Sequence, residues 1–156
     1  MKKLTAILLL ATAFSVPGVA YAKDATLEIQ MNNYQGPPAY LAVYLNKPDG
    51  SYDSTLLVAG GRTQYYQHLR GWIRGFSSSG DRLDGITGAS VGSGQTIKAT
   101  VTIQDALIDA GYAIHVDSAV ENGMENRDDV VLPLTKASSG TVVSGSGYIA
   151  AMRVTY

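Results

Sequence analysis

The chain contains no cysteine, and it has only two histidines and one tryptophan among its 156 residues. Without a thiol, structural disulfides, thiolate nucleophiles, iron–sulfur clusters and lipid attachment to a cysteine are all excluded. His68 and His115 are the only nitrogen ligands or neutral-pH bases, and two histidines in separate elements make no case for a metal site. A demanding redox role would therefore need an added cofactor.

Long apolar runs are also scarce, and the main one lies at the N-terminus, at residues 4–16. This run is shorter than the roughly 20 residues that a membrane-spanning helix needs. Lys2 and Lys3 precede it, and Ala20-Tyr21-Ala22 follows it with the small-x-small pattern of a signal peptidase site. The sequence therefore predicts a secretory signal peptide over residues 1–22, and one domain over residues 23–156 that is exported to the periplasm.

An excess of basic residues is missing as well. The chain has 12 Lys and Arg against 13 Asp and Glu, and removal of Lys2 and Lys3 with the signal peptide leaves ten basic residues, a net charge of −3. Nucleic acids and anionic membrane surfaces both call for a basic patch. Neither is an expected partner, and no membrane span is expected in the mature chain.

Short segments with apolar alternation recur through the chain and are typical of strands. In residues 25–31, Ala, Leu, Ile and Met alternate with Thr, Glu and Gln. The other predicted strands are 39–46, 51–60, 95–103, 111–120, 126–134 and 148–156. This pattern predicts a mainly β protein, an immunoglobulin-like antiparallel β-sandwich with one inserted amphipathic helix.

That helix is predicted over residues 62–76. Apolar side chains recur there at three- and four-residue steps: Tyr65, Leu69, Trp72, Ile73 and Phe76. Gly71 weakens the helix and Gly75 is expected to help end it. The residues after it, through 94, read as a loop.

The loop LDGITGASVGSG, residues 83–94, is rich in glycine and hydroxyl side chains. Its simplest interpretation is a turn between two halves of the sandwich. Gly88–Gly92 also spells G-x-S-x-G, the nucleophile elbow of serine hydrolases, and Asp109 and His115 follow in the order that those enzymes use. The elbow needs a strand before it and a helix after it, and here a loop precedes it and a β-strand follows, so a Ser hydrolase is a remote alternative.

A longer pattern supports a different role for the same serine. Residues 84–90, DGITGAS, resemble the D-x-x-[S/T]-G-A-[S/T] acceptor motif of exported flavoproteins that carry covalent FMN. The resemblance implies that a flavin transferase moves FMN from FAD to the Ser90 hydroxyl and forms a phosphodiester. Gly88 and Ala89 add almost no bulk to a loop that must enter a second enzyme. Asp84 and Thr87 complete the motif, and Asp84 would orient the loop.

The rest of the chain resembles the periplasmic family called domain of unknown function 2271. The matching pieces are Pro38-Ala39-Tyr40 with Val43, Leu69-Arg70-Gly71-Trp72, residues 87–90, Gly111-Tyr112-Ala113 and Glu121-Asn122-Gly123. A Trp-Asp-Gly turn that is usual in the family is absent, because residues 103–106 read IQDA. The resemblance implies an extracytoplasmic electron carrier, with the flavin transferase and a membrane-bound reductase bearing a peptidase-propeptide-like domain as partners.

Several residues near the loop have two interpretations. Trp72, with Tyr65 and Tyr66, is either an aromatic platform for the isoalloxazine ring or, as favoured here, an anchor for the helix. Arg70, Arg74 and Arg82 are either partners of a phosphodiester or ordinary surface charges.

Polar residues farther along the chain are expected at the surface. The acidic residues Glu121, Glu125, Asp128 and Asp129 lack the order of a calcium loop, so a solvated hairpin tip is favoured over a calcium site. His115 is expected on the surface and His68 at a solvated helix position.

Two functions from different classes therefore remain open. The first is an exported flavoprotein, with FMN on Ser90, that transfers electrons and is a substrate of the flavin transferase rather than an enzyme. The second is a cofactor-free immunoglobulin-like module that binds a protein or ligand. A Ser hydrolase is a third, remote alternative.

Overall fold

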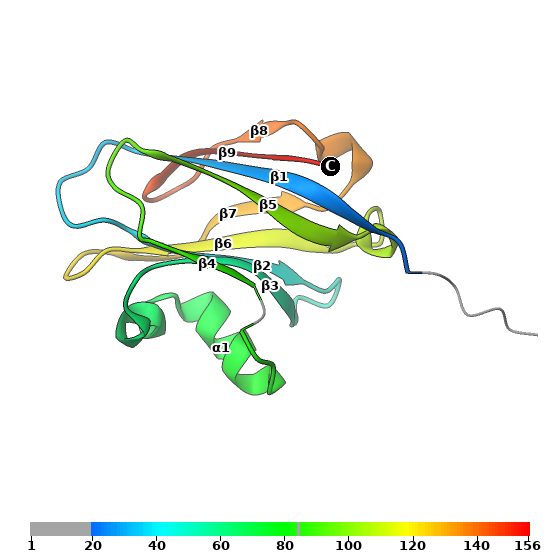
Figure 1. Ribbon diagram of the computed structural model, residues 1–156, viewed down its shortest axis with the longest axis horizontal. Helices are drawn as coiled ribbons and strands as arrows, with labels where there is room; N and C mark the ends of the chain where they lie inside the picture. The colour runs from blue at the N-terminus through cyan, green and yellow to red at the C-terminus, as the bar shows by residue number, and fades with distance from the viewer. Residues whose placement is uncertain (1–19, 84) are drawn as a thin grey trace, which may run out of the picture.

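The computed structural model describes residues 20–83 and 85–156, and it shows two β-sheets packed face to face (Figure 1). The first sheet, in spatial order, contains β5 (Thr96–Gln104), β1 (Ala22–Met31), β9 (Ile149–Thr155) and β8 (Val142–Val143). The second contains β4 (Ile86–Gly88), β3 (Tyr52–Ala59), β2 (Tyr40–Asn46), β6 (Ala113–Ala119) and β7 (Glu125–Pro133). The predicted mainly β sandwich is confirmed. Residues 1–19 of the predicted signal peptide and Asp84 of the motif lie outside the described residues.

Strand β1 shows how the sequence pattern produces the core. Ala25, Leu27, Ile29 and Met31 are each at most 2% exposed and belong to the cluster between the two sheets. The side chains between them point to solvent, because successive residues of a strand face opposite sides of the sheet. Each large apolar side chain buried this way stabilises the fold by about 1.5–3 kcal/mol.

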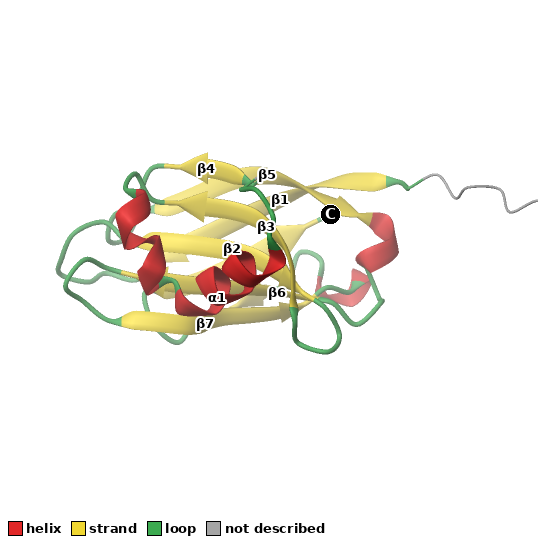
Figure 2. Ribbon diagram, turned by 90° about the horizontal axis from the view of Figure 1, so that it is seen from below, coloured by secondary structure: helices red, strands yellow, loops and turns green. Residues whose placement is uncertain are grey.

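Strand β2 is buried on both faces, as the unbroken apolar run 39–46 predicted. Leu41, Val43 and Leu45 pack into the core between the sheets. Ala42 and Tyr44 point the other way, into a second apolar cluster under helix α1 (Arg70–Ser79). Figure 2 shows α1 lying across the outer face of this sheet.

The helical region departs from the prediction at both ends. Residues 63–68 form a 3-10 helix, η1 (Thr63–His68), and Leu69, at φ −86° and ψ 71°, separates it from α1. Gly75 does not end the helix, because α1 continues to Ser79 and stops at Gly80, which has a left-handed φ of 73°. Gly75 instead permits close packing, since a Cβ there would lie 2.4 Å from the Cβ of Tyr52.

The predicted loop 83–94 contains a strand. Residues 86–88 form β4, which pairs in parallel with β3, so the second sheet is mixed rather than wholly antiparallel. Farther along, Val91 forms an isolated antiparallel bridge with Ala39. A three-residue strand carries too little alternation to be predicted from sequence. Two further 3-10 turns, η2 (Asp105–Leu107) and η3 (Lys136–Ser138), connect strands.

The expected surface position of His115 is wrong. Its side chain is 17% exposed, its ring stacks on Tyr44 with centroids 5.5 Å apart, and its Nδ1 lies 2.7 Å from Asp128 Oδ1. The cause is topological, because β6 is an interior strand and its outer face is partly covered by α1 and the side chains of β7.

The expected solvated acidic tip is also wrong. Glu121 lies in the turn between β6 and β7, but Glu125 begins β7, and Asp128 and Asp129 lie within that strand. Asp129 is only 2% exposed. A buried carboxylate is stable only when it is paired or accepts hydrogen bonds. Asp129 accepts them from the Ser118 hydroxyl and from the backbone amides of Ser146, Gly147 and Ile149.

Candidate functional site

Ser90 lies in a short span that is fixed at both sides. The Gly88 carbonyl accepts a hydrogen bond from the Gly60 amide at 2.8 Å. Val91 exchanges two backbone hydrogen bonds with Ala39, at 2.7 and 2.8 Å. Only Ala89 and Ser90 stand between these anchors, so their backbone is held against the second sheet.

The side chains around Ser90 face outward. Thr87, Gly88 and Ala89 are exposed, Ser90 is half-buried, and Val91 turns into the core at 6% exposure. A second protein can therefore reach this segment without unfolding the sandwich.

A hollow of about 420 Å³ lies beside Ser90. The other residues that line it come from the segment before β2, from β2 itself, from the β3–η1 connection and from the β6–β7 turn: Pro37, Pro38, Tyr40, Gly61, Arg62 and Glu121. With Ser90 itself, the hollow gathers four parts of the chain that are distant in sequence: residues 37–40, 61–62, 90 and 121.

Arg62 supplies a cation to this hollow. Its side chain is 67% exposed, and its Nη1 lies 3.9 Å from Glu121 Oε1. The same carboxylate accepts a hydrogen bond from the Tyr40 hydroxyl at 3.0 Å. Burial, and then the hydrogen bond to Glu121, raise the pKa of Tyr40, so its hydroxyl stays protonated and donates. The exposed guanidinium remains able to pair with an anion beside Ser90.

Two glycines near Ser90 have no role in the packing of the described chain. A Cβ added at Gly61 or Gly88 would meet no atom within 4 Å, and neither residue has a positive φ. Each of the other described glycines has a positive φ or a close neighbour at the Cβ position. Packing or backbone conformation therefore explains the other described glycines. Neither explains Gly61 in the hollow or Gly88 in the motif.

The remaining motif hydroxyls differ from Ser90. Thr87 is exposed on β4, opposite Val58 of β3. Ser93 Oγ accepts a hydrogen bond from the backbone amide of Tyr34 at 2.7 Å, which holds the loop to the segment before β2. Neither of them lines the hollow.

Trp72 occupies the interface between α1 and the sheet. It has no exposed surface, its Nε1 donates to Thr55 Oγ1 at 2.8 Å, and its ring stacks on Phe76 with centroids 5.1 Å apart. This environment matches the anchoring interpretation and leaves no free ring face for a ligand. Tyr65 is nearer to the hollow, since its ring lies 5.4 Å from that of Tyr40.

The structure brings a different arginine to Ser90 from the three that the sequence suggested. Arg70 pairs with Glu125, whereas Arg74 and Arg82 line other hollows. Arg62 was missed because no local pattern marks it. The parallel pairing of β3 with β4 brings the segment after β3, which carries Arg62, alongside the segment after β4, which carries Ser90.

The hydrolase residues are not assembled around Ser90. Asp109 Oδ1 accepts a hydrogen bond from the backbone amide of Lys136 at 3.0 Å, and His115 is bonded to Asp128. Neither Asp109 nor His115 lines the Ser90 hollow. Neither histidine is among the described residues that line the hollow, so no imidazole base lies beside this serine there.

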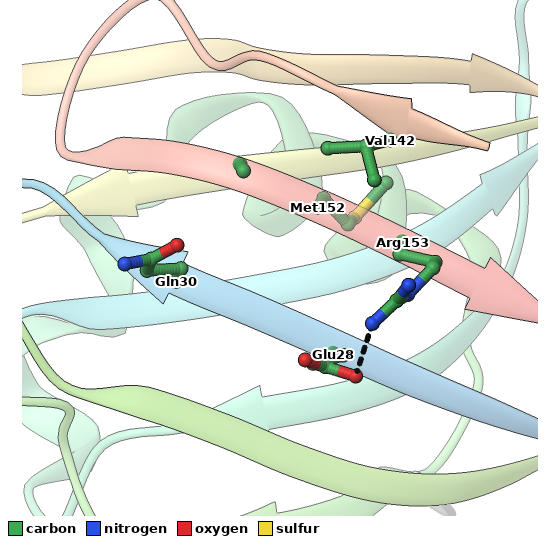
Figure 3. Close-up of a pocket in the computed structure, with 6 residues that line it drawn as sticks. Glu28, Gln30, Val142, Met152 and Arg153 are labelled. Carbon is green, nitrogen blue, oxygen red and sulfur yellow. Dashed lines mark hydrogen bonds and ion pairs between the residues drawn. The ribbon is translucent and has the colours of Figure 1, made fainter. Parts of the chain in front are cut away.

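Another hollow, of about 130 Å³, lies over β1, β8 and β9 of the first sheet (Figure 3). Arg153 Nη2 donates there to Glu28 Oε2 at 3.2 Å. Across residues 20–83 and 85–156, no group of three or more His, Asp or Glu side chains has the arrangement to hold a metal ion. In the same residues, no helix has the length and apolar character to cross a bilayer.

Comparison with known proteins places the chain in a family. No curated protein and no solved structure matches it. The family model described as "Predicted periplasmic protein (DUF2271)" matches residues 22–151, which covers both sheets up to β9. The chain belongs to this family of predicted periplasmic proteins.

Proposed function

We propose that the protein is an exported electron carrier in which FMN is attached through a phosphodiester to Ser90. The observation that carries the proposal is the position of Ser90, fixed by backbone hydrogen bonds on both sides and yet open to a second protein. The exposed residues 87–89 before it complete the described part of the acceptor motif.

The hollow fits the charge of the attached group. A phosphodiester carries one negative charge, and the exposed Arg62 guanidinium beside Ser90 is a suitable partner for it. Pro37 and Pro38 offer apolar surface on another side of the hollow. Tyr65, through its contact with Tyr40, is a better placed aromatic neighbour for a flavin ring than the buried Trp72.

Attachment makes Ser90 a substrate of the flavin transferase. The serine oxygen forms a bond to the FMN phosphorus of FAD, the pyrophosphate bond to the adenylate breaks, AMP leaves, and the hydroxyl proton is released. When bound, the flavin supplies electron transfer, which no side chain of this cysteine-free protein provides. The protein then holds the flavin outside the cytoplasm, where a diffusible cofactor would be lost.

The two unexplained glycines support the role of a second enzyme. Gly88 lies two residues before Ser90, and a side chain there would point into open space. Its small size is therefore consistent with a partner that approaches the segment closely.

Intact mass spectrometry tests this function. Protein co-expressed with a flavin transferase is expected to gain the mass of one FMN less one water, to turn yellow, and to lose both properties in Ser90→Ala. Ser93→Ala is the matched control and should keep the modification. An unmodified, colourless protein from this co-expression would contradict the proposal and favour the cofactor-free binding module.

A further inference from the structure

A second groove, of about 610 Å³, lies between α1 and the turn that joins β2 to β3. Residues at the C-terminal end of β2 line this groove, whereas Tyr40, at the N-terminal end of β2, lines the Ser90 hollow. Since β2 rises by about 3.3 Å per residue, the two hollows are on the order of 20 Å apart. The groove is therefore independent of the proposed flavin site.

Asn46, the last residue of β2, is one of the residues that line this groove. The residue is 9% exposed, and its amide Oδ1 is buried with no hydrogen-bond partner among the described residues. Buried polar atoms in proteins are nearly always paired. An unpaired buried acceptor of this kind is costly, and a ligand donor would satisfy it once the side-chain amide turns toward the groove.

Charges of both signs line the groove. Arg127 lies on β7 and Asp53 on β3, and β2, which carries Asn46, lies between these two strands. Lys47, which follows Asn46 in the turn to β3, adds an ammonium group. Arg74, in the middle of α1, adds a second guanidinium, and Asp81, just beyond the end of α1, adds a second carboxylate. The groove thus carries guanidinium groups toward β7 and α1, and two carboxylates together with the Lys47 ammonium toward β3.

The cationic side is available to a ligand. Arg127 is 61% exposed, and its pairing with Asp128, at 3.5 Å, uses Nε. The terminal nitrogens of the guanidinium therefore remain for a carboxylate. On the acidic side, Asp53 Oδ2 accepts a hydrogen bond from the adjacent Ser54 hydroxyl at 3.0 Å.

We infer that this groove binds a short peptide with free termini. The peptide carboxylate pairs with Arg127, the terminal ammonium pairs with Asp53 or Asp81, and a backbone N–H between them donates to Asn46 Oδ1. The volume lies in the usual range for small-ligand sites, and a tripeptide spans roughly 10 Å in extended form.

The chemistry distinguishes this ligand from two simpler ones. A lone anion would use the guanidinium groups but would be repelled by Asp53 and Asp81. A neutral sugar would use neither charge. A zwitterion with an N–H donor between its charges uses all three features of the groove.

The test is a titration of the purified, isotopically labelled protein with trialanine, followed by NMR. Saturable shifts are expected at the Asn46 side-chain amide and at residues 50–53 and 127, with a Kd in the millimolar range or below. Acetylated and amidated trialanine, which lacks both charges, should bind at least about tenfold more weakly.

Two variants and one control complete the experiment. Asn46→Ala and Arg127→Gln should each weaken trialanine binding about tenfold or more, and Arg127 is exposed enough that its replacement leaves the fold intact. Arg153→Gln is the matched control, since Arg153 is also a partly exposed arginine paired with a carboxylate, but on the other sheet (Figure 3). It should leave binding unchanged.

Several results would overturn the inference. They are the absence of saturable shifts, equal binding of the free and capped peptides, or unchanged binding in Arg127→Gln. Glucose or inorganic phosphate producing the same shifts as trialanine at comparable concentration would do the same.

Discussion

Asp117 Oδ2 accepts a hydrogen bond from the backbone amide of Trp72 at 2.8 Å. Asp117 lies on β6 with no exposed surface, and Trp72 lies in the first turn of α1. The N-terminal amides of a helix have no partner within it, and a carboxylate is their most favourable acceptor. Through this contact, a buried charge of the sheet fixes the start of the helix that covers it.

Replacement of Asp117 by asparagine is expected to lower the free energy of unfolding by about 2–3 kcal/mol. The carboxylate receives three donors: the Trp72 amide, the Tyr44 hydroxyl at 3.2 Å and the Asp128 amide at 3.0 Å. An asparagine amide group would turn its own donor toward at least one of them. Urea unfolding measures the loss. Asp24→Asn, at an exposed position, is the control, and an equal effect of the two changes would contradict the capping role.

Asp129 is expected to be at least as sensitive, because it connects the two sheets. From β7 it accepts backbone hydrogen bonds at 2.8 Å from Ser146, 2.7 Å from Gly147 and 3.2 Å from Ile149, which begins β9. Asp129→Asn should lower the free energy of unfolding by about 3 kcal/mol. Hydrogen exchange should accelerate first at residues 146–149, and a uniform acceleration across both sheets would show that the loss is not local.

Glu125 gives a pH-dependent contribution to stability. The hydrogen bond with His68, and then that with Arg70, lower the pKa of the Glu125 carboxyl below its ordinary value of 4.5. Because the pKa is lower in the folded state, the contribution is full above the ordinary value and disappears as the pH falls through the lowered one.

Glu125→Gln should therefore reduce stability at neutral pH by at most about 1 kcal/mol, since Glu125 is partly exposed. In strongly acidic solution the variant and the original protein should be equally stable. Thermal unfolding at a series of pH values measures this difference, and a gap that stays constant into acid would contradict the pairing.

The strands were largely predictable from sequence, whereas the contacts around the candidate site were not. Alternation in residues 25–31 fixed which side chains of β1 face the core, because one face of that sheet is buried and the other is solvated. For β6, the same alternation placed Asp117 on the polar face but gave no sign that α1 covers it.

Contacts between distant segments explain the other differences. The break at Leu69 allows Tyr66 to bond the Gly60 carbonyl while α1 crosses the sheet, and the helical periodicity continues through it unchanged. Arg62 reaches the Ser90 hollow only through the pairing of β3 with β4. No spacing within the sequence encodes a pairing between segments that far apart.

Arg62 is predicted to stabilise the protein once FMN is attached. Its guanidinium would pair with the phosphodiester beside Ser90, so attachment should raise the melting temperature of the original protein more than that of Arg62→Gln. Arg82→Gln is the control, because Arg82 lines a different hollow. Calorimetry of the modified and unmodified forms measures both differences, and equal shifts in all three proteins would exclude Arg62 as the partner.

Substitutions at Gly88 and Gly85 are predicted to distinguish what the transferase requires from what the fold requires. A Cβ at Gly88 would meet no atom within 4 Å and the residue is exposed, so Gly88→Val should change the free energy of unfolding by less than about 0.5 kcal/mol. A Cβ at Gly85 would lie 3.0 Å from the Thr55 carbonyl oxygen, so Gly85→Ala should cost about 1–3 kcal/mol.

The two variants rank in the opposite order when the rate of FMN attachment is measured. The added bulk of Gly88→Val obstructs the approach of the transferase to Ser90, and displacements of about 1 Å can cost on the order of a hundredfold in rate. The initial rate of FMN incorporation, followed by intact mass, should therefore fall by tenfold or more in Gly88→Val and by much less in folded Gly85→Ala. Incorporation at the original rate in Gly88→Val would show that the motif glycine is not read by the modifying enzyme, and its small size would then need a different explanation.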